Sequence, residues 1–125
     1  MMEKQTVDYL SFFTQKFEYL KSDVNKFVEY WMPEAPAPIL LFSAVGKSIV
    51  KHLSFFNENE KLSLFQHIEL GMTSDNEELA IAVATGLVEA LVTASDANES
   101  VWKEIEYYLQ VESKKHALAW KNFGQ

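Results

Sequence analysis

A chain of 125 residues, 48% of them hydrophobic, is long enough for a domain with a substantial buried core. It contains no cysteine, which excludes disulfides, thiolate metal sites and cysteine nucleophiles. Its net charge is -7 and all eleven basic residues are lysines, so nucleic acid is a poor partner and a basic protein a better one. The alternative is that the negative charge only keeps the protein in solution.

The first predicted helix spans residues 5–31. Large apolar residues recur in steps of three and four from Leu10 to Trp31, which is the spacing of one helical face. Ser22–Asp23 is a candidate bend, because a side-chain cap there could start a second segment. The prolines at 33, 36 and 38 end this helix, and Pro38 suits the first position of the next one, over 38–56.

Capping patterns then place the remaining helices. Asn57 with Glu60 opens a helix over 58–70 that Gly71 closes, and Ser74 with Glu77 opens one over about 74–94. Two more helices are predicted, at 99–109 and 113–123. The sequence therefore predicts a single all-α domain over 1–125, with five to six antiparallel helices in a HEAT-like or irregular helical bundle.

We expect a cytoplasmic protein that does not contact a membrane. The N-terminus lacks the basic run and apolar stretch of a signal peptide. The most apolar segment, 79–94, is interrupted by Glu89 and by small polar residues, so we expect no membrane span.

The stretch FSAVGKSIV at 42–50 contains a GKS, as phosphate-binding loops do. Such a loop needs a glycine five residues before its GK, and that position is Leu41. Gly46 instead falls in mid-helix, where the missing side chain lets another helix approach closely. The sequence thus predicts no nucleotide site and, more generally, no cofactor.

The segment 79–94 is apolar nearly all round, which is typical of a helix covered on most sides. Thr85, Glu89 and Thr93 break this pattern on one face. We interpret them as a buried polar site, with two alternatives for Glu89. Either it is a boundary residue or caps a neighbouring helix through that helix's N–H groups or a lysine, or it lines a groove and contacts a ligand or partner.

Catalytic and metal sites are not predicted. The three histidines at 52, 67 and 116 fall on different helices, and no second ligand lies at helical metal-binding spacing, so we expect surface histidines. No G-x-S-x-G elbow or other activated nucleophile is present.

Two candidate partner-binding surfaces combine aromatic and acidic residues. The first contains Asp96, Glu99, Trp102 and Glu104, an aromatic anchor with an acidic rim. The second is the proline-rich connection with Trp31 and Glu34, because a rigid loop presents side chains at low entropic cost. Several of the acidic residues lie at predicted helix starts, where the macrodipole also explains them.

The segments WMPEAPAPILLFSAVGKSIV, TGLVEAL and LQVESKKHALAWKNF resemble a family of small all-helical bacterial proteins of unknown function. The shared pattern is an aromatic–Pro–Glu loop, a helix with a small residue midway, a TG-x-x-E-A helix and a closing S-[KR]-x-x-x-x-W segment. The spacing in the last segment departs from that pattern. The matching residues are Trp31, Pro33, Glu34, Thr85, Gly86, Glu89, Ser113, Lys114 and Trp120.

Such proteins resemble immunity proteins of bacterial toxin systems, and the resemblance implies a HEAT-like surface for a partner. We therefore expect a non-catalytic module, a monomer or homodimer, that covers a basic toxin domain of the nuclease type. One alternative is a small-molecule binder or enzyme with a pocket around Glu89. Another is a structural homo-oligomer that pairs through the aromatic stripe of the first helix.

Overall fold

The computed structural model describes residues 2–123, and within them every regular element is helical. The segments α5, η2 and α6 form one continuous helix, so the described chain has seven helices and one short 3₁₀ turn, η1. The all-α prediction is confirmed. The elements are α1 (Lys4–Lys16), α2 (Glu18–Trp31), α3 (Pro38–Lys51), η1 (Leu53–Phe55), α4 (Glu58–Met72), α5 (Glu77–Ile81), η2 (Ala82–Val88), α6 (Glu89–Ser95), α7 (Glu99–Tyr108) and α8 (Val111–Asn122).

The first predicted helix is in fact two helices, which is why the described chain has seven helices and not the five or six that were predicted. The break lies at Phe17, whose backbone is extended (φ -128°, ψ 106°), rather than at Ser22–Asp23. The Phe17 side chain is buried and meets Phe56 edge to face, with ring centroids 5.5 Å apart. The break therefore lets the chain turn while keeping Phe17 in the core.

Local capping sets most of the other helix starts. Pro38 is the first residue of α3, and Asn57 and Glu60 form the predicted capping box of α4, with both N–H···O distances 2.8 Å. The Ser74 prediction was wrong by two residues. Asn76 is the N-cap that accepts from the Leu79 N–H, while the Ser74 hydroxyl oxygen accepts from Asn76 N–H within the turn.

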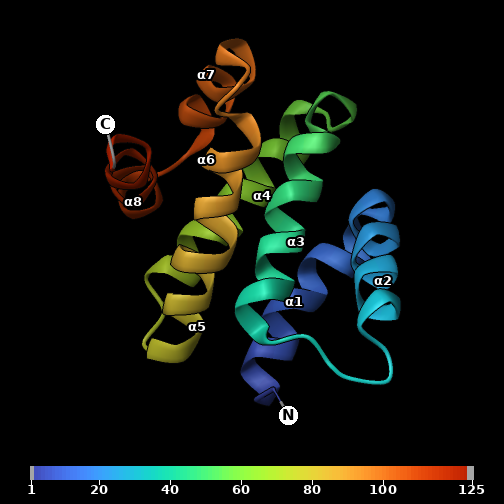
Figure 1. Ribbon diagram of the computed structural model, residues 1–125. Coiled ribbons are helices and arrows are strands. Elements are labelled where there is room, and N and C mark those ends of the chain that lie inside the picture. The colour runs from blue at the N-terminus through green and yellow to red at the C-terminus, as the bar shows by residue number, and fades with distance from the viewer. Residues whose placement is uncertain (1, 124–125) are drawn as a thin grey trace.

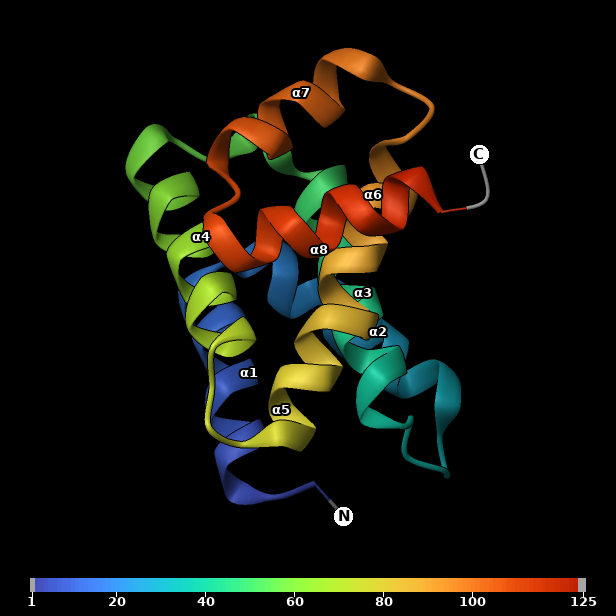
Figure 2. The ribbon, with the colours of Figure 1, turned by 90° about the vertical axis from the view of Figure 1, so that its left-hand side faces the viewer.

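The helix α3 lies in the middle of the molecule, between α2 on one side and the long α5–η2–α6 helix on the other (Figure 1). Seen from the side, α8 crosses over α4 and the long helix, and α7 lies above it (Figure 2). The packing partners of α3 are mainly η2 and α6, which do not follow it directly in the chain. The predicted HEAT-like arrangement is not matched exactly, and the structure supports the coarser description of an all-helical bundle.

Two glycines allow α3 and η2 to touch backbone to backbone. A Cβ added at Gly46 would lie 2.6 Å from the Leu87 carbonyl oxygen, and one at Gly86 would lie 2.6 Å from the Ile39 carbonyl oxygen. Neither distance is possible for a real side chain. The prediction that Gly46 permits close helix approach is confirmed, and η2, where this contact occurs, is a π-helical turn.

The long helix Glu77–Ser95 is apolar because it lies inside the fold. Its length and hydropathy would by themselves suit a membrane span, contrary to the sequence expectation. However, 56% of its most apolar window is buried against other helices of the same chain, as in the core helix of a folded domain. It packs there with fully buried residues such as Phe42, Ile49 and Leu64.

Candidate functional site

The predicted polar face of the long helix is the seam on which α8 packs. The Glu89 carboxylate lies 2.9 Å from His116 Nε2 of α8. The Trp120 indole N–H donates to the Thr93 hydroxyl at 3.4 Å. Thr85 and Thr93 are exposed and Glu89 is half-buried, so the three do not form a buried site, and Thr85 lies outside the seam. Glu89 has a partner on a neighbouring helix, but that partner is a histidine side chain, whereas helix N–H groups or a lysine were expected.

The seam extends to Asp96, the first residue of the predicted acidic and aromatic surface. Its carboxylate lies 2.7 Å from the Lys121 ammonium, which also sits 4.8 Å from the centre of the Trp102 ring. Trp102 itself is only 5% exposed. The expectation of an exposed Trp102 anchor was wrong, because its ring covers the core and α8 brings Lys121 over it.

The two other acids of this surface also have lysine neighbours. Glu104 lies 2.6 Å from Lys61 of α4, and Glu99 lies 3.8 Å from Lys103 one turn away. Of these pairs, that of Glu104 is partly buried and that of Glu99 is exposed. A partner's cations would have to compete with these lysines. Binding at these carboxylates stays a prediction.

The second predicted surface lies on the loop between α2 and α3. Glu34 is exposed, and Trp31 is half-buried with its ring 6.4 Å from that of Phe27. Residues 30–34 border a shallow hollow at this end of the molecule. The structure does not bring this loop together with the other predicted surface.

The expectation of three surface histidines was wrong, since each ring is held by helices distant in the sequence. His52 illustrates this: its Nε2 lies 3.1 Å from Asp23, which also accepts a 2.6 Å hydrogen bond from the Ser48 hydroxyl. Partial burial would raise the pKa of Asp23, but the bonds from Ser48 and His52 and the charge of Lys51 together lower it. These three side chains tie α2 to α3.

A cavity that the sequence analysis did not predict lies where the start of α1 meets the start of α5. Its volume is about 240 Å³. The Asn76 amide donates to the Gln5 side-chain oxygen at 2.9 Å, which shows how closely the two segments approach. The wall is mostly apolar. It consists of Met2, Ala37, Pro38, Ile39, Ile81 and Ala82.

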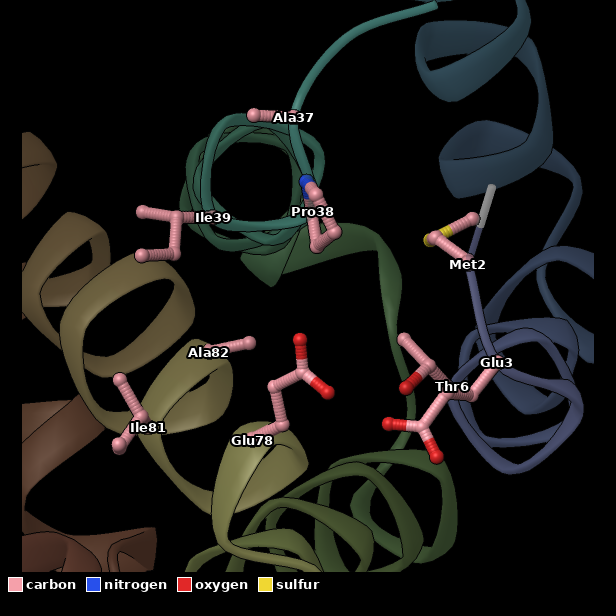
Figure 3. A pocket seen from close by; sticks show the side chains of 9 residues that line it. All are labelled: Met2, Glu3, Thr6, Ala37, Pro38, Ile39, Glu78, Ile81 and Ala82. Carbon is pink, nitrogen blue, oxygen red and sulfur yellow. The ribbon is translucent and has the colours of Figure 1, made fainter.

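Three polar side chains complete the lining: Glu3, Thr6 and Glu78. Figure 3 shows the Thr6 hydroxyl and the two carboxylates converging from α1 and α5. A hydrogen bond with Glu3 and the charge of Glu3 raise the pKa of Glu78 above its usual value. Thr6 is 6% exposed and has no hydrogen-bond partner among the described residues.

The residues around this cavity carry an excess of negative charge. Asp75 lies in the α4–α5 turn, and Glu77 and Glu78 are the first two residues of α5. No ion pair involves these three residues or Glu3 within residues 2–123. We call Glu3, Asp75, Glu77 and Glu78 the acidic end. The helix starts at 75–78 already show acidic residues in the sequence, but only folding adds Glu3 and Thr6 to them.

No cluster of three or more histidine, aspartate or glutamate side chains able to hold a metal ion occurs in the described part of the chain. Comparison with curated proteins and with solved structures finds no match. A family model, described as a domain of unknown function (DUF7674), matches residues 10–124, which is most of the chain. The protein therefore belongs to the DUF7674 family.

Proposed function

We propose that this protein is a non-catalytic module that binds a basic protein, and that the acidic end forms part of the contact. The observation that carries the proposal is that lysines neutralise the carboxylates of the first predicted surface but not those of the acidic end. Asp96, Glu99 and Glu104 each have a lysine within 4 Å, whereas the four carboxylates of the acidic end have none in the described chain.

Uncompensated charge of this kind favours association with a positively charged surface. A group of like charges that the protein itself does not neutralise produces a local negative potential, which attracts a cationic partner and speeds its encounter. Chain-wide charge adds to the effect, since the net charge is -7. The apolar walls of the adjoining cavity supply surface that binding would remove from water.

The specific form that we propose is an immunity protein that covers a basic toxin domain of the nuclease type. A nuclease surface that binds polyanionic nucleic acid is itself cationic, so an acidic cover is complementary to it. The resemblance of the sequence to small acidic helical proteins of toxin systems supports this form.

The two alternative functions gain no support. The Glu89 carboxylate, around which a ligand pocket was expected, is occupied by His116. Part of the aromatic stripe of the first two helices, expected to pair with a second copy, lies in the chain's own core, where Tyr9, Phe13 and Phe17 are buried.

The test begins with the tagged full-length protein, purified from the cells that make it naturally, and with identification of any stoichiometric companion. We expect a basic protein that is toxic when produced alone and harmless when the two are co-expressed. The absence of any such companion, or a companion of acidic charge, would contradict the proposed function.

Association rates then locate the contact. We expect Asp75→Asn with Glu77→Gln to slow association at low salt about tenfold, with less effect at high salt. The control, Glu18→Gln with Glu29→Gln, removes the same charge from exposed positions on α2 and should change the rate much less. If the control slows association as strongly, the acidic end is not the contact.

A further inference from the structure

We propose that the cavity between α1 and α5 is a binding site for a primary ammonium group on a short aliphatic chain. The Glu3 and Glu78 carboxylates and the Thr6 hydroxyl would accept its three N–H donors, and the apolar walls would contact its methylenes (Figure 3).

The polar part of the cavity is suited to a compact cation with several donors. An ammonium carries three N–H donors and no acceptor, and an ionised carboxylate offers acceptors and no donor. Bringing Glu3 and Glu78 together creates repulsion that no lysine in residues 2–123 relieves. A bound ammonium between them would replace that repulsion by attraction on both sides.

The Thr6 hydroxyl adds a third polar group to the lining of the cavity. Thr6 is 94% buried as a residue, but its oxygen is not a buried atom and faces the cavity. The hydroxyl has no hydrogen-bond partner within residues 2–123, and its oxygen points toward the space between the carboxylates (Figure 3). A ligand that reaches this space would satisfy the hydroxyl.

The size of the cavity limits the ligand to something small. Its volume of about 240 Å³ is below the roughly 300–1,000 Å³ of typical sites for drug-sized molecules. An aliphatic amine of four or five carbons, or the end of one lysine side chain, is of suitable size, and Pro38 and Ala82 provide apolar contacts for the chain.

This inference deepens the proposed function, since a lysine of the basic partner is one carrier of such a group. It can nevertheless be tested without a partner, by titrating the full-length ¹⁵N-labelled protein with n-butylamine at pH 7.5. Tetramethylammonium chloride keeps the ionic strength constant, because it is a cation without N–H donors. We expect saturable shifts of the backbone amides of Thr6, Glu78 and Ala82, with a Kd on the order of millimolar.

Two ligand controls separate the ammonium from its aliphatic chain. Butan-1-ol has the same chain without the charge, and butanoate has the opposite charge. We expect both to bind at least about tenfold more weakly than n-butylamine. Equal binding of butan-1-ol, or shifts that spread over the whole surface without saturation, would overturn the proposal.

Variants test the three acceptors individually. We expect Glu78→Gln, Glu3→Gln and Thr6→Val each to weaken n-butylamine binding about three- to tenfold. Glu78 is exposed, so Glu78→Gln should fold normally even if Thr6→Val does not. Asp75→Asn removes a neighbouring charge that does not line the cavity, and Thr85→Val removes an exposed threonine elsewhere. If these controls weaken n-butylamine binding as much as Glu78→Gln does, the amine responds only to the overall negative charge of the surface, and the cavity is not a binding site.

The two carriers of the ammonium give different outcomes. The cavity binds a lysine of the partner if two results are found together: N-acetyl-lysine amide competes with n-butylamine, and the partner binds the Glu78→Gln variant more weakly than the natural protein. If amines bind and Glu78→Gln does not change the affinity for the partner, the cavity binds a free amine. The proposed function then depends on the other residues of the acidic end. If amines do not bind and the partner still requires the acidic end, the inference fails while the proposed function survives.

Discussion

Tyr9 and His67 are joined by two hydrogen bonds that run in opposite directions. The Tyr9 hydroxyl donates to the His67 carbonyl oxygen at 2.8 Å, and His67 Nε2 lies 2.9 Å from the Tyr9 carbonyl oxygen. Because a carbonyl oxygen only accepts, the proton must be on Nε2. The imidazole is stacked between Tyr9 and Phe12, with centroid distances of 4.0 and 3.9 Å. This arrangement fastens α1 to α4.

The stability of the fold should therefore fall on acidification. Burial, aided by the charge of Lys16 and opposed by the bond to Tyr9, lowers the pKa of His67 below its usual 6.5 in the folded state. Between the folded and unfolded pKa values the unfolded chain binds more protons, so stability is complete above about pH 6.5 and decreases as the pH falls below it. Urea unfolding at pH 7.5 and pH 5 should show this loss.

The His67→Gln variant isolates this contribution. Glutamine cannot take up a proton, while Asp23–His52 and Glu89–His116 remain in both proteins. We expect His67→Gln to be less stable than the natural protein at pH 7.5, with a smaller loss between pH 7.5 and pH 5. An unchanged difference between the two pH values would exclude His67 as the source.

Gly46→Ala should destabilise the protein despite the better helix propensity of alanine. Propensity alone favours the substitution by about 1 kcal/mol. The new methyl group would lie 2.6 Å from the Leu87 carbonyl oxygen and 2.9 Å from the Ala90 Cβ, so α3 and η2 must separate. Overpacking of this kind costs about 1–3 kcal/mol or more, which outweighs the gain. Thermal unfolding should show a lower Tm, whereas Lys47→Ala at the exposed neighbouring position should change it little.

Glu69 should be needed for the docking of α8. Its carboxylate accepts from the backbone N–H groups of Glu112 and Ser113 at 2.8 and 2.9 Å, and from the Ser113 hydroxyl at 2.8 Å. A residue of α4 thus supplies the cap that α8 lacks in its own sequence. We expect Glu69→Ala to cost about 1.5–3 kcal/mol in urea unfolding and Ser113→Ala about 1 kcal/mol. Equal stability of Glu69→Ala and the natural protein would show that water replaces this cap without loss.

Glu89 and His116 should show energetic coupling. A double-mutant cycle with Glu89→Gln and His116→Gln removes each partner separately and then both. The Glu89 side chain is 17% exposed, so the pair is partly shielded from water, and we expect a coupling of about 0.5–1.5 kcal/mol at pH 6. A coupling near zero, with both single variants destabilised, would mean that α8 is held by packing alone.

Features that depend on near neighbours in the chain were predictable from the sequence. The helical periodicity, Pro38 at a helix start and the capping box of Asn57 and Glu60 each require residues only a few positions apart. Phe17 shows the limit of this approach. Its position fits the helical stripe, but core packing against Phe56 outweighs local propensity and breaks the helix there.

The sequence alone thus determined that the chain is acidic, all-helical and close-packed at Gly46, because those properties follow from composition and local spacing. Only the tertiary structure decided which charges are neutralised and which remain. Glu89 and Asp96 found partners on α8, whereas Glu3 and Glu78 were brought to each other at the edge of a cavity. The reason is physical: electrostatic and hydrogen-bond partners are set by distances of a few ångströms between helices, and the order of residues along the chain does not fix those distances.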